Sequence, residues 1–280
     1  MILAKASERW DLHKAQHVLK WTVYSLLLVN FGYYIYEDTL RATYTLTAAS
    51  SWVDWTTNFA TTIDEAAWFI LLVMLELETY VLEDEAWEGW VVWLVRGLRI
   101  VCYAMILHTL YAASDAVMVM QPTVPIEGVT NLCELTGQDL SFVANLEYTD
   151  ITSETCASLS NADQFFVVAE DPVVTDAAML DLERNMALAD LFEVAFWLII
   201  VVAIELVVYL QERGVTSGMM LQIANQTKSV LFVCLIGIGL YWAWWSHWVY
   251  LWDELLWVCG FAAIGANLSE WREEIEWKEH

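Results

Sequence analysis

Two glutamates, Glu76 and Glu205, lie in the middle of apolar stretches that are long enough to cross a lipid bilayer. The surrounding segments 64–83 and 193–212 align with each other without a gap. The identical pairs are Ala66/Ala195, Trp68/Trp197, Ile70/Ile199, Val73/Val202, Glu76/Glu205, Leu77/Leu206, Tyr80/Tyr209 and Glu83/Glu212. Recurring Leu and Val are common in membrane helices, but a central Glu between a recurring Trp and a recurring Tyr is not. The sequence therefore predicts an internal repeat built around a polar position.

A carboxyl group at this depth can bind and release a proton or an inorganic cation. An ionisable side chain at the bilayer centre costs about 2.5–3.5 kcal/mol on insertion scales, so it indicates a functional site whose face points into a helix bundle. Residues four apart share one face of a helix, which places Tyr80 beside Glu76 and Tyr209 beside Glu205. The predicted ion pathway therefore comprises Glu76, Glu205, Tyr80 and Tyr209.

The next apolar segment carries two basic residues, Arg96 and Arg99, one turn apart. Counted from the short connection at 84–89, they reach a depth similar to that of Glu76 and Glu78. An ion pair between the two helices is the simplest interpretation and needs no transport function. Removing one partner of such a buried pair typically costs about 3–5 kcal/mol, even though the pair itself contributes little net stability.

The second repeat offers Glu205 no comparable arginine, because residues 234–238 of the following apolar segment carry no charge. Three alternatives follow for this carboxyl group. Glu205 borrows Arg96 or Arg99, stays protonated at neutral pH, or binds a cation.

The composition is that of a polytopic membrane protein. The chain is 59% hydrophobic with a mean hydropathy of +0.47, and it contains 17 Trp but only 3 Pro. Trp residues cluster near the ends of the apolar windows, as in the aromatic belts of membrane interfaces. We predict an all-α fold with about six transmembrane helices, at 18–36, 65–83, 90–113, 190–211, 229–248 and 250–268. Five is the alternative count, because residues 247–254 fit either a tight outer turn or one continuous helix.

These spans divide the chain into five segments, and the basic residues orient them. The segments are an amphipathic inner leader at 1–17, spans at 18–113, an outer loop domain at 114–189, spans at 190–268 and a charged inner tail at 269–280. With both termini in the cytoplasm, only Arg41 and Arg184 fall outside. The inner set is Lys5, Arg9, Lys14, Lys20, Arg96, Arg99, Arg213, Lys228, Arg272 and Lys278. The first apolar run has no convincing cleavage site. We expect a multi-pass protein of a cell membrane, such as a bacterial inner membrane.

The outer loop domain is strongly acidic. It carries 13 Asp or Glu residues against one Arg, within a chain whose net charge is −25. This charge excludes nucleic acid as a partner. It could concentrate cations at the mouth of a pathway, although acidic loops also simply stay soluble and are common in salt-adapted proteins. Cys133 and Cys156 are the only cysteines in this domain, and we expect them to form a disulfide in an oxidising compartment.

A weaker repeat follows the paired helices and involves His108 and His247. Each His precedes a Tyr by three residues, and an Asp follows, at Asp115 and Asp253. Both helical hairpins would run in the same sense, which predicts a parallel repeat about the membrane normal. The two His side chains could form a symmetric metal or haem site, but with no third strong ligand they are more typical of interfacial residues. No cofactor is expected.

Three classes of function remain. A cation or proton channel or transporter explains the paired Glu residues and the acidic outer domain. A non-catalytic accessory or structural subunit of a larger membrane complex, or a homo-oligomer, explains the repeat and the belts equally well. A redox protein would need the His pair. Enzyme activity is not expected, because HExxH, GxSxG, GxGxxG and phosphate-binding glycine loops are absent. Residues 68–80 are similar to the second helix of voltage-sensor domains, but the regularly spaced arginines and TVGYG-like filter of such channels are absent.

Overall fold

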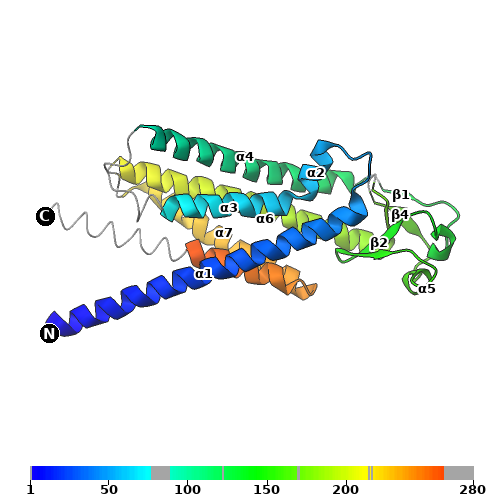
Figure 1. Cartoon of the computed structure of the whole chain (residues 1–280), viewed down its shortest axis with the longest axis horizontal. Helices are drawn as coiled ribbons and strands as arrows, with labels where there is room; N and C mark the ends of the chain where they lie inside the picture. Colours follow the sequence, from blue (N-terminus) through cyan, green and yellow to red (C-terminus); the bar gives the residue numbers. More distant parts are fainter. Residues whose placement is uncertain are drawn as a thin grey trace. The chain divides into compact units, whose positions relative to one another are not determined.

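The computed structural model describes residues 2–76, 89–121, 123–168, 171–213, 215 and 217–261, and the chain is mostly helical, at 73%. It divides into two compact units (Figure 1). One unit combines residues 1–33 with 225–280, and the other is Tyr34–Ala224. Because α1 (Ile2–Thr45) is one continuous helix, the expected leader at 1–17 and the first expected span belong to the same element.

The larger unit contains a set of long helices. These are the end of α1, α3 (Ala60–Glu76), α4 (Trp90–Val119) and α6 (Ala177–Glu212). The middle helix, α4, packs against both α3 and α6, and Figure 1 shows that α3 and α6 run in the same direction, opposite to α4. The two helices that carry Glu76 and Glu205 therefore run parallel to each other.

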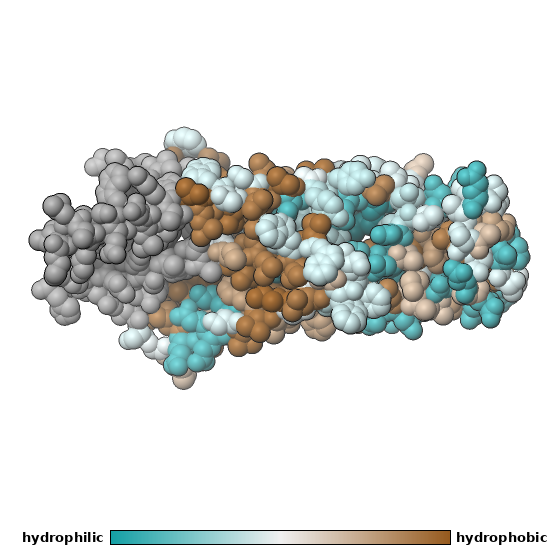
Figure 2. Space-filling model, turned by 90° about the horizontal axis from the view of Figure 1, so that it is seen from below, coloured by the Kyte–Doolittle hydropathy of each residue, from teal (hydrophilic) through white to brown (hydrophobic). Residues whose placement is uncertain are grey.

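Three helices among the described residues are long and apolar enough to cross a membrane. They are Trp90–Val119, Ala177–Leu210 and α7 (Met219–Trp244). The expected span at 65–83 continues beyond the described part of α3. Exposed Trp side chains lie near the ends of the long helices, at Trp52, Trp55, Trp90, Trp93, Trp244 and Trp248. Figure 2 shows apolar residues gathered over the helical part and hydrophilic residues frequent on the part that carries the sheet.

The segment between the expected spans at 18–36 and 65–83 is mostly helical. After α1 ends at Thr45, a short helix α2 (Trp52–Asn58) leads almost directly into α3. Ser51 and Asp54 form a capping box, in which each side chain accepts a hydrogen bond from the other residue's backbone N–H. The box satisfies backbone donors that the first turn leaves without partners, and so it specifies where α2 begins.

The acidic domain contains a five-stranded sheet that the all-α expectation did not include. Its strand order is β1-β4-β5-β2-β3, and all neighbours are antiparallel except the β2–β5 pair. The strands are β1 (Val124–Pro125), β2 (Ser141–Ala144), β3 (Glu147–Asp150), β4 (Phe165–Val167) and β5 (Val173–Asp176). Its small core is made by Leu132, Leu135, Phe142, Ile151, Cys156, Phe165 and Val174.

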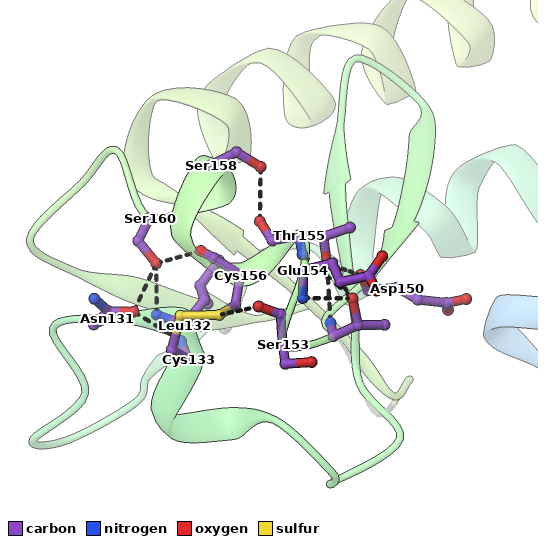
Figure 3. Close-up of a disulfide and its surroundings, with 11 residues drawn as sticks. Asn131, Leu132, Cys133, Asp150, Ser153, Glu154, Thr155, Cys156, Ser158 and Ser160 are labelled. Carbon is purple, nitrogen blue, oxygen red and sulfur yellow. Dashed lines mark hydrogen bonds between the residues drawn. A yellow bond between two sulfur atoms is a disulfide. The ribbon is translucent and has the colours of Figure 1, made fainter.

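Cys133 and Cys156 lie at disulfide-bonding distance, as expected from the sequence, with their Cα atoms 4.8 Å apart (Figure 3). They join a short 3₁₀ turn, η3 (Leu132–Leu135), to the short helix α5 (Cys156–Leu159). Ser160 supports the same junction: its Oγ donates to the Cys156 carbonyl at 2.7 Å and accepts from the Leu132 N–H at 2.8 Å. Cross-linking across this 23-residue separation restricts the unfolded chain, which the chain-entropy model values at about 3 kcal/mol.

The boundaries of the acidic domain differ from the expected 114–189. Helix α4 continues to Val119, and α6 begins already at Ala177. Arg184 explains how the two helix ends are held together. Its guanidinium donates to the carbonyls of Met120 at 3.0 Å and Gln121 at 3.2 Å, which the end of α4 leaves without intrahelical partners.

In the smaller unit, α7 is followed by a turn and then by a second helix that is described over residues 248–261. Ser246 at this turn has φ 75°, a left-handed conformation that ends the helix. Residues 247–254 therefore do not continue α7. Asn30 on α1 donates a hydrogen bond to Asp253 on the second helix at 2.8 Å, and both side chains are buried.

Candidate functional site

Glu205 lies at the interface between α6 and α4. Its side chain is half-buried, and its Oε1 accepts a hydrogen bond from the hydroxyl of Tyr103 on α4. Buried neighbours on the two helices, Cys102, Ile106, Val201 and Ala203, are apolar. Glu205 is therefore directed into the helix set, as its charge demands. The Tyr103 hydroxyl is a partner for this carboxyl group that was not among the three predicted alternatives.

Tyr103 shares a face of α4 with the two arginines. The spacing of three and then four residues places Arg96, Arg99 and Tyr103 along one stripe, and the Tyr103–Glu205 bond shows that this stripe turns toward α6 at residue 103. The side chain of Arg99 is half-buried, whereas that of Arg96 is exposed. Among the described residues, Arg96 makes no ion pair.

Tyr209 follows Glu205 by one turn on α6, as expected, but its side chain is 49% exposed. The guanidinium of Arg213, one further turn along, lies 4.4 Å from the centre of its ring, a cation–π contact. Glu205, Tyr209 and Arg213 thus form a polar line along α6 toward the end that lies away from the sheet. The contact that orients the Tyr209 ring comes from Arg213.

The partner position of the repeat, Glu76, is the last described residue of α3, and its side chain lies outside the described part, as do Glu78 and Tyr80. The predicted contact of Glu76 or Glu78 with Arg96 or Arg99 therefore stays a prediction. The level of Glu76 is nevertheless set by the helix. Trp68 and Trp197, the matched tryptophans of the repeat, contact each other edge to face at 5.5 Å between ring centroids.

The two glutamates follow their tryptophans by the same distance. Glu76 and Glu205 each lie eight residues, about 12 Å of helix, after Trp68 and Trp197, and α3 and α6 run in the same direction. Leu72 and Val201 lie one turn before each glutamate. They are 8% and 9% exposed, so both residues are buried.

The two histidines are surrounded by aromatic rings. His108 stacks on Tyr111 at 6.0 Å, and His247 stacks on Tyr250 at 5.3 Å and contacts Trp242. The shared spacing of three residues therefore has a packing role in both copies. His108 and His247 belong to different units. Within the described part of the chain, no group of three or more His, Cys, Asp or Glu side chains is placed to hold a metal ion.

Arg41, one of the two basic residues expected outside, forms a clamp between α1 and the start of α3. It pairs with the buried Asp38 at 2.8 Å and also donates to the Asn58 carbonyl. Asp38 additionally accepts from the backbone N–H and the hydroxyl of Thr62, at 2.9 and 2.7 Å. Burial raises the pKa of Asp38, and Arg41 and Thr62 offset part of that effect. Arg41 and Arg184, the two arginines expected outside, therefore both bind helix-end carbonyls.

The acidic residues of the sheet-bearing domain form an exposed surface, and Arg184 pairs with one of them, Asp181, at 3.5 Å. The exposed members are Glu127, Glu134, Asp139, Glu147, Asp150, Glu154, Asp163 and Asp181. Glu183 is the exception, because its side chain is only 2% exposed. It accepts hydrogen bonds from the backbone N–H groups of Asn145 and Leu146, the turn between β2 and β3.

Tyr103 is the site residue that the sequence analysis missed. It has no polar counterpart in the second hairpin, so the repeat could not reveal it. The available signal was its spacing of four from Arg99, which puts it on the face of α4 already assigned to polar contacts.

Comparisons with protein-family profiles, with curated proteins and with solved structures find no match to this chain.

Proposed function

We propose that the protein is a multi-pass membrane protein of the cation or proton transport type, in which Glu205 binds the transported ion. The observation that carries this proposal is a carboxyl group within an apolar candidate span, half-buried at the α4–α6 interface and held by one tyrosine hydroxyl. Within the described part of the chain this contact engages one carboxyl oxygen, and we assign the second to a proton or a cation. An intramembrane acid placed in this way marks ion pathways and proton relays in membrane proteins.

The repeat supports a pathway with two carboxyl groups at one level. The Trp68–Trp197 contact and the common direction of α3 and α6 support a common height for Glu76 and Glu205. In this proposal, Tyr80 and Tyr209 continue the pathway toward the inner side. The acidic surface of the outer domain increases the local concentration of cations at its other end, an effect that weakens at high salt.

In the proposed topology, the chain crosses the membrane six times and both termini lie in the cytoplasm. The hairpins 64–113 and 193–248 form a parallel repeat. The turn after Trp244 supports the separation of the last two helices. Within the larger unit, Arg96, Arg99 and Arg213 lie at the helix ends away from the sheet, as expected for the cytoplasmic side. A bacterial inner membrane, with the disulfide domain in the oxidising compartment, fits this orientation.

Flux through reconstituted liposomes tests the proposal. Wild-type protein should pass protons or cations under a voltage or pH gradient, and Glu205→Gln should reduce the flux to background. The matched control is Glu212→Gln on the same helix, which should retain flux. Unchanged size-exclusion profiles and unfolding midpoints would show that both variants remain folded.

The alternative function is a non-catalytic subunit of a larger membrane complex or a homo-oligomer. If the wild-type protein passes no ion above background under any gradient, the transport proposal fails. Copurification with a stoichiometric membrane partner would then favour the accessory function, in which the Glu205–Tyr103 bond serves to join two helices.

A further inference from the structure

Two layers of matched apolar side chains separate Glu205 from the acidic domain. The first layer is the pair Trp68 and Trp197, which are 6% and 9% exposed and pack edge to face. Leu72 and Val201, one turn further along α3 and α6, are each buried, and we take them as the second layer. The level of Glu205 lies one turn beyond them, so about 12 Å of helix lies between the tryptophans and the carboxyl group.

The orientation of these layers follows from the chain itself. Helix α6 begins at Ala177, directly after β5, and its first turns are attached to the sheet by Glu183. Moving along α6 from the sheet, the chain reaches Trp197 first, then Val201 and finally Glu205. The tryptophan layer therefore lies on the side of Glu205 that leads to the acidic domain.

The ring of Trp68 is held in place by a polar contact. Its indole N–H donates to Asp64 Oδ2 at 2.9 Å, one turn earlier on α3. The bond fixes the polar edge of the indole toward the start of the helix and leaves the ring face for Trp197. An edge-to-face pair of this kind adds about 0.5–1.5 kcal/mol to the contact beyond the area that it buries.

We propose that Trp68, Trp197, Leu72 and Val201 form a hydrophobic gate that closes Glu205 to the outer aqueous side. The inference rests on the proposed function, because it names the regulation of the same site. Apolar constrictions exclude water and therefore ions, and they open when their side chains separate or become hydrated. The internal repeat supplies both halves of each layer, so one helix displacement would open both layers together.

Thiol accessibility tests the gate independently of flux. Glu205→Cys is introduced after the three free cysteines, Cys102, Cys234 and Cys259, are changed to Ala, and the native disulfide is kept. A charged, membrane-impermeant thiol reagent is added from the outer side of oriented vesicles. With the gate intact the new cysteine should react slowly, and Trp68→Ala with Trp197→Ala should increase the rate by about tenfold or more.

A gentler variant and a matched control accompany this experiment. Val201→Thr keeps the shape of the side chain and adds a hydroxyl, so it should hydrate the second layer and accelerate labelling without leaving a cavity. Trp52→Ala with Trp55→Ala removes two exposed tryptophans near the same side and should leave the labelling rate unchanged. The unfolding midpoint and the unreactive disulfide serve as checks of the fold.

Equal labelling rates in the parent, the Trp68→Ala/Trp197→Ala variant and the Val201→Thr variant would overturn the gate. Its failure can be distinguished from failure of the transport proposal. Accelerated labelling in a protein whose wild-type form conducts nothing would support the apolar barrier and refute transport. Wild-type flux that depends on Glu205, together with labelling rates that do not change in the Trp68→Ala/Trp197→Ala variant, would support transport and refute the gate.

Discussion

Glu183 and Glu205 lie on the same helix, but their carboxyl groups are held in different ways. Glu183 is almost fully buried and accepts from two backbone N–H groups of the β2–β3 turn. Glu205 is half-buried and accepts from one side-chain hydroxyl, that of Tyr103. Backbone donors cannot rotate away from the carboxylate, whereas a tyrosine hydroxyl can. Burial alone therefore does not identify a functional acid, and the nature of its donors separates a structural carboxyl group from a candidate ion site.

The turn that Glu183 holds is a strained one. Asn145 and Leu146 both adopt positive φ values, 56° and 63°, as a two-residue type I′ hairpin requires. Leu is unfavourable in this conformation because its Cβ crowds the backbone. Glu183 compensates by satisfying the two N–H groups, and Tyr148 of the same hairpin stacks on Tyr44 of α1 at 5.3 Å. These contacts fasten the sheet to the helices.

The largest expected effect is the loss of Glu183. Glu183→Ala leaves the backbone donors of the half-buried Asn145 and Leu146 without this acceptor. An unsatisfied donor costs about 1–3 kcal/mol, and water offsets part of this cost, so the protein should lose about 2–4 kcal/mol of stability. Chemical unfolding of the full chain in detergent measures it. The matched control is Asp181, an exposed acidic residue two positions earlier on α6, and Asp181→Ala should change stability by less than about 0.5 kcal/mol. An equally small effect of Glu183→Ala would contradict the structural assignment.

Coupling between Glu76 and the arginines of α4 is the next largest effect. If Glu76 meets Arg99, the double variant Glu76→Gln/Arg99→Gln should recover part of the combined loss, with a coupling energy of about 1–3 kcal/mol. The same cycle with the exposed Arg96 distinguishes the two arginines. Strictly additive effects in both cycles would mean that Glu76 has another partner, and the cycle with Glu78 would then be measured.

The mostly helical fold could be predicted, because apolar length is a local property of the sequence. The cysteine pair followed from composition, because the domain contains only these two. Each of these predictions needed only local spacing or the absence of competing residues.

The sheet and the donors to Glu183 could not be predicted in the same way. The strands are two to four residues long, too short to show an alternating pattern, and their pairing order joins segments distant in the sequence. The extra turns of α4 and α6 depend on Arg184, whose role as a cap becomes visible only when the two helix ends meet. Tyr103 was missed for a similar reason: its partner lies 102 residues away.

Tyr103→Phe should have a smaller effect that sharpens the assignment of Glu205. The substitution removes only the hydroxyl and should cost about 1 kcal/mol of stability, the typical net value of one hydrogen bond. Under the proposed function it should reduce flux less than Glu205→Gln does, because Glu205 itself remains. Liposome flux tests this, with Tyr111→Phe on the same helix as the control. Flux and stability identical to those of the wild type would show that the Tyr103 hydroxyl does not support Glu205.

The smallest expected effect is the contribution of Glu183 to the pH dependence of stability. Glu183 precedes the expected span at 190–211. Burial raises the pKa of Glu183 above its ordinary value of 4.5, and the N–H groups of Leu146 and Asn145 offset part of that rise. A raised pKa means that the folded state binds the proton more tightly than the unfolded state, so the contribution is complete below about pH 4.5 and is lost as the pH rises through the folded-state pKa. Glu183→Gln keeps one acceptor oxygen and cannot ionise. Its unfolding midpoint should therefore rise relative to that of the wild type between acidic and neutral pH. Parallel midpoints across that range would show that the Glu183 carboxyl group titrates alike in the folded and unfolded chains.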